Sequence, residues 1–104
     1  MSIMIGVKNK RRKNMKLHEL KIKDEYFKEV LRENKTFELR KNDRDYQVGD
    51  LIHFVDIDGN NHIIGNPAYN KKLVFQITYI LQNVQEYGLD NDYCILAIKK
   101  LEIR

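Results

Sequence analysis

The chain has 104 residues, the usual length of a single domain, and 42% of them are hydrophobic while 33% are charged. Its apolar stretches are no longer than a strand, which excludes a membrane-spanning helix. The single cysteine excludes a disulfide framework and a multi-cysteine zinc site.

The net charge of +4 comes from the first 14 residues. They hold five basic side chains and no acid, whereas residues 15–104 hold 14 basic and 15 acidic side chains, a net charge of −1. A basic segment attracts polyanions without sequence preference. Met15 is itself a plausible start, so an inert leader is an equally good interpretation of this segment. We predict a basic, disordered tail over residues 1–14 and a single domain over residues 15–104.

The first elements expected are a strand over residues 17–23 and a helix over residues 24–33. In the strand, apolar and polar side chains alternate. In the helix, Asp24 is placed to cap the first turn, and Asn34 is placed to take the left-handed position after the last turn. The buried stripe of the helix is formed by residues at helical spacing, namely Phe27, Val30 and Leu31.

The rest of the chain predicts strands separated by polar turns. The turn signal Asp58-Gly59-Asn60-Asn61 predicts a hairpin, and residues 65–71 and the segment around Tyr87-Gly88-Leu89 are expected to be loops. The strands are expected at residues 36–40, 51–57, 62–64 (short), 73–81 and 93–103. One helix with five or six short strands indicates an α+β, mainly β fold, built as a small, partly closed barrel.

A row of polar side chains on the strand 36–40 is the first candidate site. Period-two alternation places Thr36, Glu38 and Arg40 on one face. Arginine offers a planar fork to phosphate or to a base edge, and glutamate accepts from an amino group. The alternative is a solvent-facing strand surface with ordinary charge pairing.

The segment Asn-Lys-Thr-Phe-Glu-Leu-Arg, residues 34–40, resembles the Gly-x-Lys-x-x-Glu-x-Arg signature of the ASCH superfamily, which it matches at Lys35, Glu38 and Arg40. Residues 17–100 are similar to a bacterial and phage family of ASCH-like domains of unassigned function. The segments that carry this wider resemblance are His18–Lys21, Phe37–Asp50, Thr78–Leu81 and Tyr87–Leu89.

The resemblance implies a PUA-like β-barrel with a cleft between helix and sheet that binds RNA or a nucleotide-like ligand. His18 is expected at the rim of this cleft, and Tyr46 and Tyr87 are candidates for stacking on a base. The polar contacts expected are Lys35, Glu38, Arg40 and Asn42. No metal and no cofactor are expected, since the three histidines lack metal-ligand spacing.

Two other functions stay open. Some small ASCH members are amidohydrolases that act on acetylated cytidine, and here Lys35 would be the base, Thr36 the nucleophile and Glu86 the distant carboxylate. The match is incomplete, because Glu38 stands where those enzymes have threonine. The third possibility is a phage or mobile-element accessory protein that acts by protein contacts, which an exposed apolar patch would favour.

Three further residues and the location complete the expectations. His53 and His62 are expected on the surface, and Cys94 lies in a run typical of a buried strand. Residues 3–7 are too short for the apolar region of a signal peptide, and the basic run follows them. With one thiol and no export signal, a cytoplasmic location is expected.

Overall fold

The computed structural model describes residues 14–65 and 73–102. Nearly all of the expected basic tail, most of the loop 65–71 and the last residue of the expected strand 93–103 lie outside the described residues. Within the described ranges, no helix is long and apolar enough to cross a membrane.

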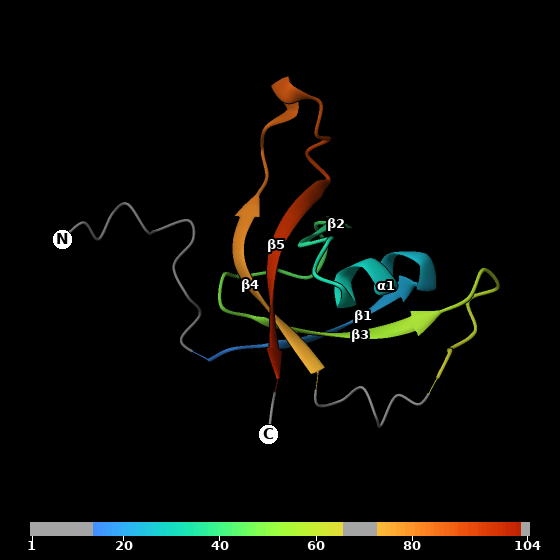
Figure 1. The fold of residues 1–104 in the computed structure, drawn as a ribbon. Coiled ribbons are helices and arrows are strands. Elements are labelled where there is room, and N and C mark those ends of the chain that lie inside the picture. The colour runs from blue at the N-terminus through green and yellow to red at the C-terminus, as the bar shows by residue number, and fades with distance from the viewer. Residues whose placement is uncertain (1–13, 66–72, 103–104) are drawn as a thin grey trace.

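The described residues form one curled, five-stranded sheet with a helix against it (Figure 1). The strand order is β1-β3-β4-β5-β2; β1 and β3 run parallel, and the other neighbours run antiparallel. The elements are β1 (Leu17–Lys23), α1 (Asp24–Leu31), β2 (Phe37–Lys41), β3 (Leu51–Ile57), β4 (Leu73–Leu81), the 3₁₀ turn η2 (Gln85–Tyr87) and β5 (Tyr93–Glu102). The α+β, mainly β class is therefore confirmed, and the sheet is an open half-barrel.

The expected sixth strand over residues 62–64 is reduced to a single bridge between Ile57 and Ile63. The turn before it forms as predicted, because the Asp58 carboxylate accepts hydrogen bonds from the backbone N–H groups of Asn60 and His62. The turn signal therefore correctly predicted that the chain reverses here, but residues 62–64 do not pair with β3 as a strand.

The helix α1 ends two residues earlier than its periodicity predicts. Glu33, not Asn34, has the left-handed conformation, with φ of 63°. The Asn34 side chain instead donates to the Glu29 carboxylate at 3.0 Å, which ties it back to the helix. Asp24 is the first helical residue rather than the cap, because Lys23 occupies the cap position without a side-chain bond. Both corrections shift a terminus and leave the helix in place.

The core lies between α1 and the concave face of the sheet. Phe54 on β3 is at its centre, with Phe27 of α1 at 6.2 Å and Phe75 of β4 at 5.3 Å between ring centroids, both edge-on. Cys94 on β5 is fully buried, as predicted, and burial raises the pKa of its thiol. It is a core side chain and not an activated nucleophile.

The prediction for His53 is wrong, whereas His62 is exposed as expected. β3 lies between β1 and β4, and four consecutive residues, Ile52–Val55, are buried. A strand buried on both faces leaves no exposed position for its odd-numbered residues, so His53 is buried with Val55 on the face opposite Phe54.

Candidate functional site

The two edge strands of the sheet, β1 and β2, approach each other without pairing, and arginine side chains bridge them. The Leu51 N–H donates to the Lys16 carbonyl, so even-numbered β1 carbonyls face β3 and odd-numbered ones face the gap. Arg40 Nη2 donates to the Lys21 carbonyl at 2.7 Å, and Arg44 Nη1 donates to the Glu19 carbonyl at 3.0 Å. Side chains therefore satisfy β1 carbonyls that a closed barrel would pair with a strand.

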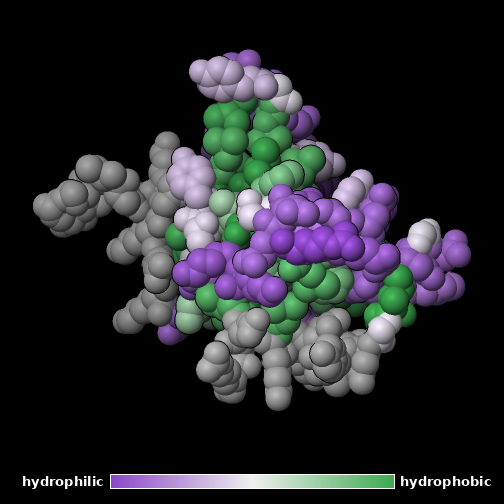
Figure 2. Space-filling model, viewed as in Figure 1, coloured by the Kyte–Doolittle hydropathy of each residue, from purple (hydrophilic) through white to green (hydrophobic). Residues whose placement is uncertain are grey.

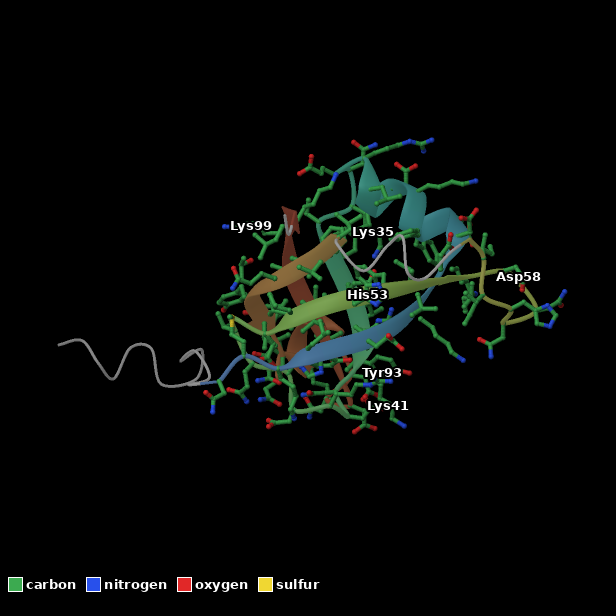
Figure 3. The ribbon with its side chains drawn as sticks, turned by 90° about the horizontal axis from the view of Figure 1, so that it is seen from below. Lys35, Lys41, His53, Asp58, Tyr93 and Lys99 are labelled. Carbon is green, nitrogen blue, oxygen red and sulfur yellow. The ribbon has the colours of Figure 1, made fainter. Side chains whose placement is uncertain are left out.

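A cleft of about 380 Å³ lies at this gap, beside the start of α1. It contains five cations, one carboxylate and two aromatic rings. Lys35 and Lys41 lie near opposite ends of β2 (Figure 3). The lining residues are Lys21, Ile22, Lys23, Tyr26, Lys35, Phe37, Glu38, Leu39, Arg40 and Lys41.

A buried carboxylate organises the floor of the cleft. Glu38 is only 4% exposed; one of its oxygens accepts from the Lys35 ammonium and the other from Arg40 Nε at 2.9 Å. Lys35 also donates to the Phe37 carbonyl at 2.7 Å and lies 5.0 Å from the centre of the Phe37 ring. The carboxylate is thus fully paired, which is the condition for burying it.

This network shows which face of β2 is inside. Glu38 and Arg40 do share a face, as predicted, but that face is turned inward, while Phe37 and Leu39 are about half exposed. The alternative of a solvent-facing polar row is therefore wrong for Glu38. Thr36 precedes β2 and lies in a different hollow, with Val30 and Lys100 among its neighbours.

The expectation of His18 at the rim is wrong. His18 is buried, and its Nε2 forms a 2.9 Å hydrogen bond with the buried Asp50 carboxylate. Tyr46 is buried beside it, with ring centroids 4.8 Å apart, and burial raises the pKa of the tyrosine. These three residues form a polar group inside the half-barrel, separate from the residues that line the cleft.

The remaining candidates lie elsewhere. Asn42 donates to the Gln82 side chain at 2.8 Å. Glu86 and Tyr87 lie on η2, at the tip of the arm formed by β4 and β5, which projects away from α1 (Figure 1). Tyr87 is 84% exposed. Of the expected contacts, the structure therefore brings together Lys35, Glu38 and Arg40.

Four residues at the gap were not among the sequence candidates. Lys21 and Lys23 lie two residues apart on the exposed face of β1. Tyr26 lies on the first turn of α1, and Arg44 follows β2. Their types were visible in the sequence. The sequence does not show that these residues lie close together, because this depends on β1 and β2 being the two edges of one sheet.

Comparison with known proteins matches residues 17–98 to the family model named DUF3850, a domain of unknown function. The chain belongs to the DUF3850 family. The DUF3850 match runs from the first residue of β1 into β5 and includes every residue of the cleft. No curated protein matches the chain. Family membership therefore names no ligand, and the function must be argued from the cleft.

Proposed function

We propose that this DUF3850 domain binds RNA or a nucleotide-like ligand in the cleft between β1, α1 and β2. The observation that carries the proposal is the combination of five cations with two half-exposed aromatic rings around one cavity. Its volume of about 380 Å³ lies in the range of small-ligand sites.

The cations divide into two groups. Lys35 and Arg40 are held by Glu38. Lys21, Lys23 and Lys41 are exposed, and among the described residues no carboxylate lies within ion-pair distance of them. The second group is therefore available for phosphate, which supplies much of the affinity of nucleic-acid binding.

The aromatic rings supply the second half of the recognition. Tyr26 and Phe37 are 47% and 48% exposed and both line the cleft. The Lys35 ammonium lies 5.9 Å from the centre of the Tyr26 ring and 5.0 Å from that of Phe37, so it lies near both rings. A base that stacks on either ring would gain roughly 1–3 kcal/mol without a sequence requirement.

The likeness of residues 34–40 to the ASCH signature supports the same proposal, because Lys35, Glu38 and Arg40 all reach the cleft. We propose on this basis that the half-barrel is of the PUA-like kind. The amidohydrolase function has less support: Lys35 and Thr36 line one hollow, but the Lys35 ammonium is paired with Glu38, and Glu86 lies on η2.

The test is a fluorescence-anisotropy titration of short single-stranded RNA on the full chain. The basic residues near the N-terminus would attract RNA of any sequence. The five cations of residues 8–13 are therefore changed to glutamine, and we call this variant the tail-neutral chain. We expect this chain to bind. Lys23→Gln combined with Lys41→Gln should weaken binding about tenfold and reduce the magnitude of the salt slope by about 1.4, since each phosphate contact on a single strand contributes about 0.7.

The matched control is Lys99→Gln, an exposed lysine in the hollow beside Thr36 and not in the cleft. It removes the same charge and should leave the affinity within about twofold of the tail-neutral chain. Loss of all binding on neutralising the tail, or equal loss in the control, would show that the cleft is not the site.

A second candidate function, contact with another protein, is favoured by an apolar surface on the convex side of the sheet. Figure 2 shows hydrophobic side chains gathered over the arm formed by β4 and β5. The register places the members of this apolar face side by side on three strands. They are Phe37, Leu39, Tyr79, Leu81, Tyr93, Ile95 and Ala97.

The size of the apolar face limits what it supports. It is two strand spacings wide and two dipeptide steps long, roughly 10 Å by 13 Å between Cα atoms. A stable interface takes about 20–30 residues on each partner, whereas this face has seven. The face therefore supports a weak contact, and nucleotide binding in the cleft is the first proposal.

A further inference from the structure

A second hollow of about 430 Å³ adjoins the cleft at the bridge between β1 and β2. It shares Lys21 and Arg40 with the cleft. Its lining residues are Glu19, Lys21, Arg40, Arg44, Val55 and Ile63. Three cations and one carboxylate therefore surround a second cavity that the nucleotide site as described does not use.

Both arginines of this second hollow are oriented before any ligand arrives. Arg40 is fixed by Glu38 and by the Lys21 carbonyl, and Arg44 by the Glu19 carbonyl. Each guanidinium has five N–H donors, and these bonds use only some of them. The unused donors are held in place at no further conformational cost, which is the requirement for tight binding of an anion.

The one carboxylate of the hollow does not dominate it. Glu19 is mostly exposed, and the nearest base to its carboxylate is His53 Nδ1 at 3.5 Å. Lys21, Arg40 and Arg44 outnumber it, so the local charge is positive. An apolar wall of Val55 and Ile63 reduces the competition from water on one side.

We propose that the second hollow is a phosphate subsite and that the ligand of this domain is a single-stranded oligonucleotide crossing Arg40. One nucleotide would occupy the cleft, and the phosphate of its neighbour would lie between Lys21, Arg40 and Arg44. This inference rests on the proposed function and narrows it, because a site for a lone nucleotide would have no use for the second hollow.

The test compares adenosine monophosphate with hexa-adenylate on the tail-neutral chain, by isothermal titration. We expect the oligonucleotide to bind at least about tenfold more tightly. Arg44→Gln should remove most of that advantage and leave the affinity for the monophosphate unchanged, since Arg44 lines the second hollow and not the cleft. The matched control is again Lys99→Gln, which should preserve the advantage.

Arg44 also closes the sheet edge, so a second variant guards against misfolding. Ile63→Glu adds a carboxylate at an exposed position of the same hollow and leaves in place the arginine hydrogen bonds between β1 and β2. It should weaken hexa-adenylate about tenfold and spare the monophosphate.

The outcomes separate the two proposals. Equal affinity for both ligands, with no effect of Arg44→Gln or Ile63→Glu, would overturn the phosphate subsite while the nucleotide site stands. Failure of the tail-neutral chain to bind either ligand would overturn the proposed function and the subsite with it.

Discussion

Asp50 shows how much of this fold depends on one buried side chain. Its carboxylate accepts from His18 Nε2 at 2.9 Å, from the Gln47 N–H at 3.1 Å and from the Lys16 N–H at 3.2 Å. It therefore links the turn before β3 to the start of β1, a strand 34 residues earlier in the chain. The sequence pattern marks Asp50 only as part of a turn, because nothing local shows that its partners come from β1.

At this scale we predict that Asp50→Ala lowers the free energy of unfolding by about 3–5 kcal/mol, because His18 and two backbone N–H groups lose the acceptor that they share. Urea denaturation of the full chain measures it. The control is Asp58→Ala, since Asp58 also accepts two backbone hydrogen bonds but its side chain is 40% exposed. It should cost about 1 kcal/mol. Similar losses in the two variants would contradict the structural role assigned to Asp50.

At the scale of elements, periodicity predicted the strands well because period two is a property of the local sequence. The ranges 17–23, 51–57 and 73–81 coincide with β1, β3 and β4. What periodicity cannot give is which face is inside. On β2 an amphipathic rule would bury Phe37 and Leu39, yet the structure buries Glu38, because two cations from the same segment satisfy its carboxylate.

The same limit applies to the site. Lys35, Glu38 and Arg40 were found from one strand, since their spacing lies within it. Lys21 and Arg44 were missed because they meet only through the arrangement of the two edges. Sequence reasoning therefore reached the part of the site that one element carries and missed the part that the topology assembles.

The junction of α1 and β3 gives a prediction of pH dependence. The Asp56 side chain is hydrogen-bonded to Asp24, the first residue of α1, whose carboxylate also lies 3.0 Å from the Lys28 ammonium. Burial, with the hydrogen bond and charge of Asp24, raises the pKa of Asp56 to about 6 from 3.8. The Lys28 hydrogen bond, with a further one from Asp56, lowers the pKa of Asp24.

The sign follows from the proton balance. Between about pH 4 and pH 6 the folded chain holds a proton on Asp56 that the unfolded chain has lost, so this contribution to stability falls as pH rises. The lowered pKa of Asp24 has the opposite effect on stability: its contribution is lost as the pH falls below the usual range of an aspartate. Asp56→Asn keeps a donor for Asp24 and removes the charge, so we expect it to raise the melting temperature near pH 7 by a few degrees and to change little near pH 4.

Thermal unfolding followed by circular dichroism across this pH range measures the effect. Asp92→Asn is the control, because the Asp92 side chain is exposed and the substitution should shift the curve equally at every pH. A pH-independent effect of Asp56→Asn would show that Asp56 titrates normally in the folded chain.

At the scale of the whole molecule, the sheet is curled but open, and its two sides have different chemistry. The gap between β1 and β2 is bridged by charged side chains, whereas the apolar face on β2, β4 and β5 is exposed. Both features follow from the strand order, which leaves β1 and β2 without backbone partners and leaves the arm of β4 and β5 without a covering helix (Figure 1). The small area of the apolar face leads to a prediction about solution mass.

We expect light scattering to give the mass of a single chain at micromolar concentration and a rising mass only toward millimolar concentration. Tyr79→Thr combined with Leu81→Thr should abolish the rise, because both side chains are exposed on the β4 part of the face and neither lines the cleft. The same variant should unfold at nearly the wild-type urea concentration, since exposed side chains contribute little to the core. A stable dimer at micromolar concentration would mean that the interface includes more of the surface than the apolar face. A constant mass at all concentrations would show that the chain does not self-associate through this face. In either case the nucleotide cleft is tested separately, because no residue of β4 lines it.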